Sequence, residues 1–470
     1  MVWYNDGMKK AKFDFDLVVI GSGAAGSAGA MYAAGAGLKV AVVEGGRFGG
    51  AALNRADVPY AALLSATHLF SKAVEGAKFG LTSDNLRLNY SILSHWKSVA
   101  MRRAGADDDG ALVEAGVTCL QGRARFLNQN EIMVEGAKGE AEKISAERFL
   151  VATGSRVIDP GIAGAGNAGI LTPEAVLTLS QVPRTVFVVG GGATGCEIAQ
   201  YFAEVGARVV IAEIAGRLLP KEDEEAGALI EKVFAKRNKI SALTGARVTK
   251  IEREAAGGKR VSYMLNGQER AVRVDVVVLA TGEGADVRDL DLEKAGVNVG
   301  KNGVLVSATM ETSRKNIFAA GEATGEIGSI EIAAYQARLA VINMLHRQQA
   351  EANYVGFMRV VRTYPEVASV GLSEDECVRQ ARNYKKAVAP LSAVSASNIF
   401  DFSDGFAKVV TDSTGRIIGA TVVAPEAGIL IQELALAIRM GLTAQDIAET
   451  PHSMLDFSEA VKVGMRKVGK

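Results

Sequence analysis

The chain has 470 residues, enough for about three domains of ordinary size. Lys+Arg and Asp+Glu both number 53, and a net charge of zero gives no support to binding of nucleic acid or of an anionic membrane surface. Hydrophobic residues make up 48% of the chain, a globular composition that argues against disorder. No apolar signal core opens the sequence and no apolar run is long enough to span a membrane. We therefore expect a cytoplasmic protein without membrane insertion.

The first predicted element is a buried strand over residues 16–21, DLVVIG, which runs into the spacing Gly21, Gly23 and Gly26. This G-x-G-x-x-G spacing opens an Ala-rich helix, and a second strand follows and ends at Glu44. Gly21 permits a tight turn, Gly23 lets a pyrophosphate approach the backbone, and Gly26 lets the helix pack on the strand. The acidic residue about 20 positions later is typical of one that holds a ribose. The pattern predicts a dinucleotide-binding unit, although a glycine-rich turn without a ligand remains the alternative.

The same pattern recurs in the middle of the chain. A strand over residues 184–189 leads into Gly190, Gly192 and Gly195, and a further strand ends at Glu213. Two such units predict two dinucleotides, or one unit without a ligand, and two different nucleotides suit hydride transfer between cofactors. A carboxylate at Glu213 favours NADH over NADPH, but Arg217 lies four residues on, so a phosphate site stays open.

Three further strands mark the organisation of the chain. Those within 149–155 and 276–284 each run into Ala-Thr-Gly, and the one within 317–325 ends at Gly321 and Glu322. From residue 351 onward the pattern changes to alternating strands with two helices and no nucleotide signal, which predicts a separate C-terminal domain.

These features resemble the pyridine nucleotide-disulfide oxidoreductases of the glutathione reductase, dihydrolipoamide dehydrogenase and mercuric reductase type. The resemblance includes TSRKNIFAAGE (312–322), YPEVASVGLSEDE (364–376) and the long stretch 405–450. It implies an α/β fold with two Rossmann-like domains, one for FAD and one for NAD, and an α+β C-terminal domain that forms a homodimer. The expected boundaries are FAD-binding domain, first part, 1–152; NAD(P)-binding domain, 153–281; FAD-binding domain, second part, 282–350; and dimerisation domain, 351–470.

The resemblance also implies which residues contact the cofactors. The cofactor-binding positions it implies are Gly21, Gly23, Ala24, Ala25, Gly26, Glu44, Gly49, Gly50, Ala51, Ala124, Ala152, Thr153, Gly154, Gly321 and Glu322 for FAD, and Gly190, Gly192, Gly195, Glu213 and Gly282 for the nicotinamide nucleotide. Glu322 replaces the Asp that the family places at the flavin ribityl chain.

The sequence departs from the family where the family's redox disulfide lies. The family pattern G-G-T-C-x-N-x-G-C-x-P-S-K corresponds to Gly49–Ala61, in which Ala52 and Asp57 occupy the two Cys positions. Ala61 replaces the Lys that pairs with a Glu, here Glu197, close to the flavin. Asp57 is therefore expected beside the flavin, or as a cap of the helix that starts near Pro59, and the two roles are compatible.

The family's C-terminal acid/base is changed as well. In the run HSMLDFSE, Met454 stands at the position of the acid/base His, and Glu459 keeps the position of the Glu that holds that His. His452 is expected to be a structural or interface residue; a shifted alignment would make it the base, at the cost of the matched Ser458 and Glu459. The candidate catalytic residues are Asp57, Glu197 and Glu459.

The three cysteines and four histidines are scattered, which predicts neither a disulfide framework nor a metal site. We expect Cys119 on a strand, Cys196 as a packing residue and Cys377 exposed. Disulfide exchange needs an attacking and a resolving thiol. The leading hypothesis is therefore an FAD-dependent NAD(P)H:acceptor oxidoreductase that passes electrons to a small-molecule acceptor such as a quinone, a dye or oxygen. A non-catalytic or weakly catalytic flavoprotein that acts as a nucleotide sensor or complex component is the alternative.

Overall fold

The computed structural model describes residues 13–82, 85–166, 169–255, 257–325, 328–346 and 349–468. The first 12 residues, part of the segment that gave no sign of a signal core, lie outside this range. The chain forms two compact units. The first unit comprises the residues up to Pro59, Ser98–Ile158 and Glu283–Asn353, and the second comprises Tyr60–Lys97, Asp159–Gly282 and Tyr354–Lys470.

A mostly parallel sheet forms the centre of the first unit. Its strands lie in the order β3-β2-β1-β6-β5-β4, with β17 paired to β6. Their bounds are β1 Phe15–Ile20, β2 Val40–Glu44, β3 Thr118–Gln121, β4 Arg123–Asn128, β5 Glu131–Glu135, β6 Ala141–Val151 and β17 Ile317–Ala319. Strands β1, β2, β3, β6 and β17 pair in parallel, and β4 and β5 join through antiparallel pairs.

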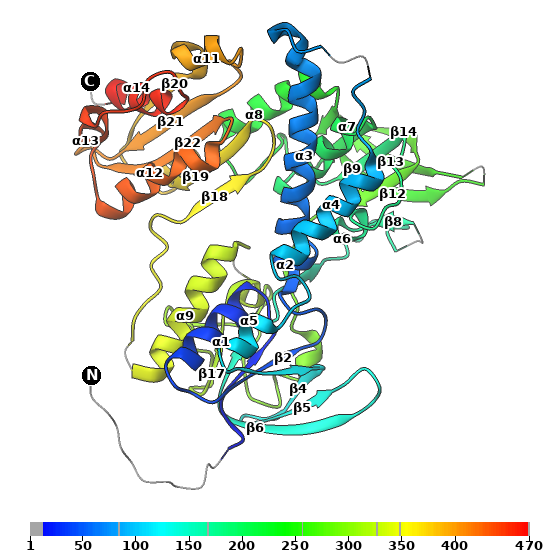
Figure 1. Ribbon diagram of the computed structural model, residues 1–470, viewed down its shortest axis with the longest axis vertical. Coiled ribbons are helices and arrows are strands. Elements are labelled where there is room, and N and C mark those ends of the chain that lie inside the picture. Colours follow the sequence, from blue (N-terminus) through cyan, green and yellow to red (C-terminus); the bar gives the residue numbers. More distant parts are fainter. Residues whose placement is uncertain are drawn as a thin grey trace. The chain divides into compact units, whose positions relative to one another are not determined.

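The alternation of side chains along β1 divides the core of this unit between two faces of the sheet. Leu17 and Val19 pack with α1 (Ala24–Gly35) and α9 (Ile330–His346), while Val18 and Ile20 pack with residues of β4–β6. All four side chains are at most 3% exposed. Such continuous apolar runs are typical of parallel strands covered on both faces. Helices α1 and α9 lie against each other over the sheet (Figure 1).

Short elements complete the first unit. Strands β7 and β16 form a small antiparallel pair. The bounds are α2 Gly50–Asn54, α5 Gly110–Glu114, β7 Ser155–Val157, β16 Glu283–Ala285, and the 3-10 turns Arg288–Leu290 and Gly321–Thr324. The helices α3 (Asp57–Glu75) and α4 (Tyr90–Arg103) connect the two units along the chain.

The second unit repeats the parallel arrangement. Its five-stranded parallel sheet has the order β11-β10-β9-β15-β8. A three-stranded antiparallel sheet, β12-β13-β14, belongs to the same unit. The bounds are β8 Ile170–Leu171, α6 Pro173–Val176, β9 Thr185–Val189, α7 Ala193–Glu204, β10 Arg208–Glu213, α8 Glu224–Val233, β11 Ser241–Thr244, β12 Arg247–Arg253, β13 Lys259–Leu265, β14 Gln268–Val274 and β15 Val276–Leu279, with a 3-10 turn at Gly76–Phe79 and a π turn at Phe234–Asn238.

The C-terminal part of the second unit is an antiparallel sheet with helices. The strand order is β18-β19-β22-β21-β20, and α12 packs on β19 and β22 while α14 packs on β20 and β21. The bounds are β18 Met358–Val361, β19 Glu366–Gly371, α10 Glu374–Arg379, β20 Lys385–Pro390, a 3-10 turn at Leu391–Ala393, α11 Ser395–Ile399, β21 Phe406–Thr411, β22 Ile417–Ala424, α12 Ala427–Met440, α13 Ala444–Glu449 and α14 Ser458–Val468. The expectation of two helices was too low, because α10, α11 and α13 are short turns of helix without a long apolar period.

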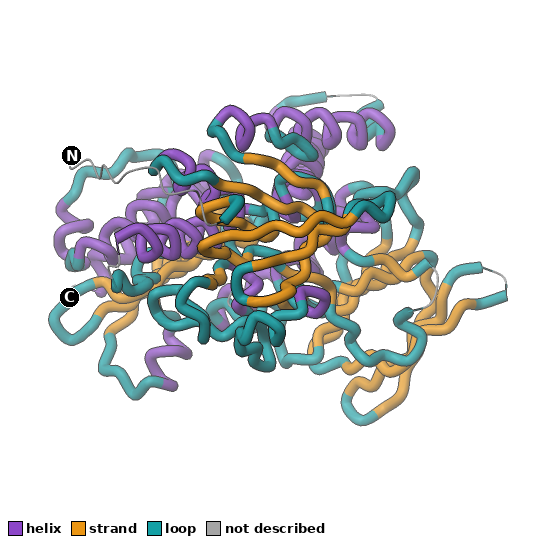
Figure 2. Tube along the Cα trace, turned by 90° about the horizontal axis from the view of Figure 1, so that it is seen from below, coloured by secondary structure: helices purple, strands orange, loops and turns teal. Residues whose placement is uncertain are grey.

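The predicted fold class, two Rossmann-like domains and an α+β C-terminal domain, is confirmed. In Figure 2 the strands gather into separate sheets, with helices beside the larger ones. Among the described residues, no helix combines the length and the apolar character needed to cross a bilayer.

Candidate nucleotide and flavin sites

The turn between β1 and α1 can be made only with glycine at two positions. Gly21 has φ +102°, and a Cβ on it would lie 2.4 Å from the carbonyl oxygen of Ala152. A Cβ on Gly26 would lie 1.8 Å from the carbonyl oxygen of Gly21. Both contacts are backbone contacts that no side-chain movement can relieve.

Gly23 differs from these two glycines, because the chain itself leaves room for a side chain there. The nearest atom to its Cβ position is the Cα of Gly50, at 3.9 Å. Gly23 is also the N-cap of α1 and has no side-chain capping bond, so the first amides of this helix have no such partner. An open glycine in front of a helix N-terminus suits a pyrophosphate, and the residues present therefore fit a dinucleotide.

Glu44 ties the turn to the end of β2. Its Oε2 accepts hydrogen bonds from the backbone N–H of Ser22 at 2.8 Å and from the Ser22 hydroxyl at 2.6 Å. Its Oε1 accepts the N–H of Gly46 at 2.6 Å. Glu44 is only half-buried. The carboxylate lies beside the glycine turn, where it was expected to hold a ribose.

The second glycine turn repeats the first in detail. Gly190 has φ +106°, and its Cβ would lie 2.3 Å from the carbonyl oxygen of Ala280; that of Gly195 would lie 1.9 Å from the carbonyl oxygen of Gly190. No atom lies within 4 Å of a Cβ placed on Gly192, which is again an N-cap without a side-chain bond. Ala152 and Ala280 belong to the two Ala-Thr-Gly runs, so the backbone of each run packs directly against one glycine turn. Gly282, which ends the second run, has φ +114°.

Glu213 is buried at the end of β10, with 7% of its surface exposed. Its carboxylate accepts the N–H of Gly191 at 2.6 Å and the N–H of Ala215 at 2.7 Å. Arg217, the cation that could have bound a 2′-phosphate, forms hydrogen bonds with other groups of the chain. Its Nη2 donates to the carbonyl oxygens of Pro220 and Glu222 and to Asp375 Oδ2, the last at 3.1 Å. The geometry around Glu213 thus suits ribose hydroxyls better than a 2′-phosphate.

The remaining residues expected at the flavin lie in the first unit. Gly49 and Gly50 have φ +87° and +61°, and a Cβ on Gly50 would lie 2.5 Å from the Cα of Gly23. The loop that begins at Gly49 therefore lies directly on the first glycine turn. The other expected positions are Ala24 and Ala25 in the first turn of α1, Ala51 in α2, Ala124 in β4, Thr153 and Gly154 after β6, and Gly321 after β17.

Asp57 is the first residue of α3 and is exposed. The helix therefore begins two residues before Pro59, and Asp57 lies inside its first turn rather than ahead of it. A carboxylate in the first turn is favoured by the helix dipole.

Glu322 takes part in a contact that the sequence did not suggest. The Ser155 hydroxyl lies 2.9 Å from Glu322 Oε2 and is also in hydrogen-bond contact with Glu283 Oε2. Burial, and then the charges of Glu283 and Asp57, raise the pKa of Glu322 against the lowering influence of Ser155 and Arg55. Ser155 and Glu283 each directly follow an Ala-Thr-Gly run. That shared position is the one feature of the sequence that could have indicated their contact.

Glu197, the predicted partner of the replaced Lys, lies on α7 in the second unit. Its Oε1 accepts the backbone N–H of Arg362 at 2.7 Å. Tyr60 lies in the same unit and donates its hydroxyl to the carbonyl oxygen of Pro173 at 2.6 Å. Burial, and then the charge of Glu197, raise the pKa of Tyr60.

The C-terminal run places its residues around the start of α14. His452 Nδ1 lies 2.9 Å from the carbonyl oxygen of Thr450, and Nε2 lies 3.2 Å from Glu433 Oε1. Met454 is 71% exposed. Glu459 lies in the first turn of α14, and its Oε2 is buried without a hydrogen-bond partner among the described residues. His452 is thus held by neighbours on its own unit, in agreement with a structural role.

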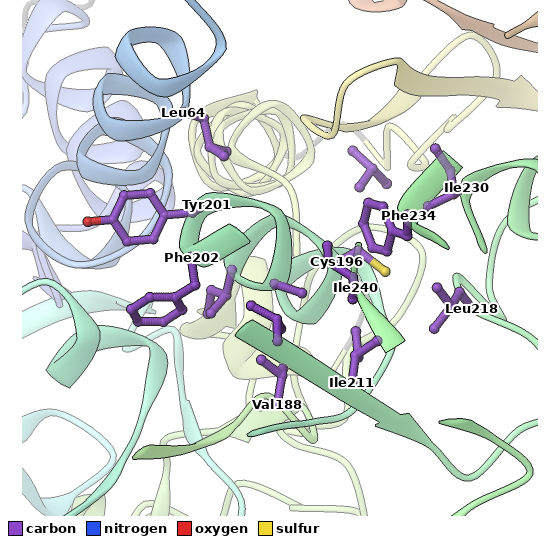
Figure 3. Packing of buried hydrophobic residues seen from close by; sticks show 14 of the residues in the cluster. Leu64, Val188, Cys196, Tyr201, Phe202, Ile211, Leu218, Ile230, Phe234 and Ile240 are labelled. Carbon is purple, nitrogen blue, oxygen red and sulfur yellow. The ribbon is translucent and has the colours of Figure 1, made fainter. Parts of the chain in front are cut away.

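The three cysteines are unpaired. Cys119 lies on β3, as expected. Cys196 lies among large apolar side chains of α7 and its neighbours (Figure 3), and burial raises its pKa. The expectation that Cys377 is exposed was wrong: it has 0% exposure, because it lies on the inner face of α10 whereas Val378 points outward.

Comparison with known proteins identifies the family. The profile of the pyridine nucleotide-disulphide oxidoreductases matches residues 15–337, and that of their dimerisation domain matches residues 357–464. The chain is 31% identical to dihydrolipoyl dehydrogenase of Geobacillus stearothermophilus over 93% of each chain, and 30% identical to mercuric reductase of Bacillus cereus over 97% of this chain and 72% of that one. The solved structure of LpdA from Mycobacterium tuberculosis superposes with a TM-score of 0.86 at 26% identity, over 96% of this chain and 99% of that one. The chain belongs to the pyridine nucleotide-disulphide oxidoreductase family, whose cofactors are FAD and NAD(P)H.

Proposed function

We propose that the chain is an FAD-dependent NAD(P)H:acceptor oxidoreductase that passes electrons to a non-disulfide acceptor such as a quinone, a dye or oxygen. The observation that carries the proposal is the loop Gly49–Ala61, in which Ala52 and Asp57 stand at the positions of the family's two redox cysteines. The three cysteines of the chain lie on β3, α7 and α10, unpaired. Disulfide exchange needs two cooperating thiols, so the proposal departs from the relatives' named activities at the acceptor.

The cofactor assignment follows the two glycine turns. We assign the first turn, with Glu44, Gly49, Gly50 and Glu322, to FAD, and the second turn, with Glu213, to NADH. Bound at the first turn, FAD would supply hydride acceptance from the nicotinamide and two-electron transfer to the acceptor. The open Gly23 and Gly192 and the uncapped N-termini of α1 and α7 support this assignment. The four expected domain boundaries and a cytoplasmic location stay predictions.

We further propose a homodimer. The match to the dimerisation domain over residues 357–464 supports it. By the family resemblance, the segment with His452, Met454 and Glu459 would face the flavin of the other subunit. In that arrangement Met454 can neither donate nor accept a proton, which suits an acceptor that is not a thiol.

Anaerobic titration tests the acceptor proposal directly. Full reduction of the bound flavin should need one NADH equivalent per FAD and should show no long-wavelength thiolate-to-flavin band, because Ala52 and Asp57 cannot store electrons. Quinone should be reduced at steady state, whereas dihydrolipoamide and glutathione disulfide should not turn over. Consumption of a second equivalent, or loss of activity on alkylation, would show a hidden thiol pair and refute the proposal.

Glu213 should set the preference for NADH. Glu213→Ala should weaken NADH use by about ten- to a hundredfold, since a hydrogen bond to a charged group contributes about 1.5–3 kcal/mol. The gap to NADPH should narrow, and kcat/KM for both nucleotides measures the change. Glu213→Gln keeps the shape of the side chain and one acceptor for the Gly191 amide. Its kcat/KM for NADH should lie between that of the unmodified chain and that of Glu213→Ala. Equal use of both nucleotides by the unmodified chain would remove the basis for this prediction.

Asp57 should lower the flavin potential. An ionised carboxylate beside the cofactor opposes added negative charge, so Asp57→Asn should raise the potential by tens of millivolts, on the scale of about 30 mV for about 1.4 kcal/mol. Reoxidation by quinone should slow in the same variant. Spectroelectrochemical titration measures the potential; an unchanged potential and rate would leave Asp57 a residue of the helix start alone.

A second candidate, a weakly catalytic flavoprotein that senses nucleotides or belongs to a complex, is favoured by one contact. The Glu322 carboxyl, expected at the ribityl chain, is engaged with Ser155 at 2.9 Å. Flavin that is reduced by NADH but turns over with no acceptor would select this candidate.

A further inference from the structure

Three side chains of the first unit form a hydrogen-bonded row between the candidate flavin site and solvent. Ser155, on β7, is 3% exposed. Its hydroxyl contacts Glu322 Oε2 at 2.9 Å on one side and Glu283 Oε2 on the other. Glu322 is half-buried, whereas Glu283, on the antiparallel partner strand β16, is exposed. The row therefore leads from a shielded carboxyl to one in contact with water.

The single hydrogen of the Ser155 hydroxyl bears on the protonation of this row. A serine hydroxyl carries a single hydrogen and can donate it to only one of the two carboxyl oxygens. The other contact then needs a hydrogen from the carboxyl itself. Glu322 is the carboxyl that binds a proton more readily, because it is less exposed than Glu283 and lies near the charges of both Glu283 and Asp57. With Glu322 protonated, Glu322 would donate to Ser155 and Ser155 would donate to Glu283; with Glu322 ionised, Ser155 donates to Glu322 instead.

The backbone confines Glu322 to this position. A Cβ on Gly328 would lie 2.0 Å from Glu322 Oε1, so that glycine provides the space for the carboxyl. On the other side, Arg55 Nη2 donates to the carbonyl oxygen of Ser155 at 3.3 Å. These neighbours hold the serine and the carboxyl in the geometry that a proton transfer between them requires.

We propose that Glu322, Ser155 and Glu283 form a proton relay that supplies the proton consumed when the acceptor is a quinone, an inference that rests on the proposed function. The overall reaction is NADH + H⁺ + quinone → NAD⁺ + hydroquinone, so each turnover takes one proton from solvent. Glu322 gives its proton into the candidate flavin site, Ser155 passes its hydrogen to Glu322, and Glu283 takes a proton from water and passes it to Ser155. This chain requires another proton donor, because Met454 at the family's acid/base position cannot donate a proton.

Two readouts on the FAD-loaded protein test the relay. The first is the infrared carbonyl stretch of a protonated carboxylic acid at neutral pH, assigned with isotope-labelled glutamate. It should be present in the unmodified protein and in the exposed control Glu293→Gln, and it should be lost in Glu322→Gln. The second is reduction of benzoquinone by NADH, which should slow by about a hundredfold in Ser155→Ala, in the range of general acid catalysis.

Rescue by a small acid separates a relay from a structural role. Imidazolium in the buffer should restore most of the rate in Ser155→Ala and Glu283→Gln, because a diffusible donor can replace the missing link, and it should leave Glu293→Gln unchanged. FAD content of each variant confirms folding. Quinone rates equal to the control, with no carboxylic acid signal, would overturn the relay while leaving the proposed function intact. If the unmodified protein reduces no quinone, the proposed function fails and the relay fails with it.

Discussion

Replacing Gly26 with alanine should release FAD and lower the free energy of unfolding of the first unit by about 3 kcal/mol, the upper range for overpacking. The added Cβ would lie 1.8 Å from the carbonyl oxygen of Gly21, so α1 and the turn must separate. That movement displaces the helix N-terminus from the place where a pyrophosphate would bind. Flavin absorbance per chain and denaturant unfolding measure the two effects.

The same helix contains its own control. Gly35 is the last residue of α1, has no atom within 4 Å of a Cβ position, and does not have a positive φ. Gly35→Ala should therefore keep FAD and raise the free energy of unfolding by a few tenths to about 1 kcal/mol, because alanine loses less conformational freedom than glycine in a helix. Equal effects at Gly26 and Gly35 would contradict the close packing of the turn.

The difference between these two glycines shows what the sequence could and could not predict. The spacing of Gly21, Gly23 and Gly26 between an apolar strand and an Ala-rich helix is a local pattern, and this pattern alone is sufficient to predict the turn. Glu44 and Glu213 could be predicted from the sequence equally well, because each ends the strand that follows a glycine turn. Local chemistry and short spacing are sufficient where one βαβ unit makes the site.

The contacts that could not be predicted join distant parts of the chain. Ser155 contacts Glu283 and Glu322, which are 128 and 167 positions away. Arg217 donates a hydrogen bond to Asp375, 158 positions away, and so has a partner other than a nucleotide phosphate. The side of α10 that faces the core decides the burial of Cys377, and a six-residue helix is too short to show a clear period. In each case tertiary packing, rather than the local pattern, determines the outcome.

A buried pair in the second unit has the same long-range character. His68 on α3 places Nε2 3.6 Å from Glu204 Oε1 on α7, and their side chains are 17% and 3% exposed. Gln200 donates to Glu204 at 2.8 Å and accepts the N–H of Tyr364 at 2.9 Å. The His68 ring lies 5.5 Å from that of Tyr364. The pair thus connects α3, α7 and the segment before β19.

Burial shifts the two pKa values in opposite directions. It raises the pKa of Glu204 from 4.5 to about 7, against hydrogen bonds from Thr67 and Gln200 that lower it. It lowers the pKa of His68 from 6.5 to about 4, with a smaller contribution from the charge of Lys72. Both residues are thereby kept closer to neutral than they would be in water.

The two shifts should have opposite effects on stability. Between pH 4.5 and 7 the folded chain holds more protons on Glu204 than the unfolded chain, so this residue makes stability fall as pH rises. Between pH 4 and 6.5 the unfolded chain holds more protons on His68, so this residue makes stability rise with pH. Each contribution is on the order of 3 kcal/mol, and the two nearly cancel where the ranges overlap.

Replacing either residue should reveal its own contribution to the pH dependence of stability. Relative to the unmodified chain, Glu204→Gln should gain stability as the pH rises from 4.5 to 7, and His68→Gln should lose stability as the pH rises from 4 to 6.5. The difference in free energy of unfolding from the unmodified chain, measured in denaturant at a series of pH values, isolates each slope because all other groups cancel. Glu269→Gln removes an exposed carboxylate from the same unit and should show neither slope. Parallel profiles for all three variants would show that the pair is fully hydrated in solution and that burial does not set its protonation.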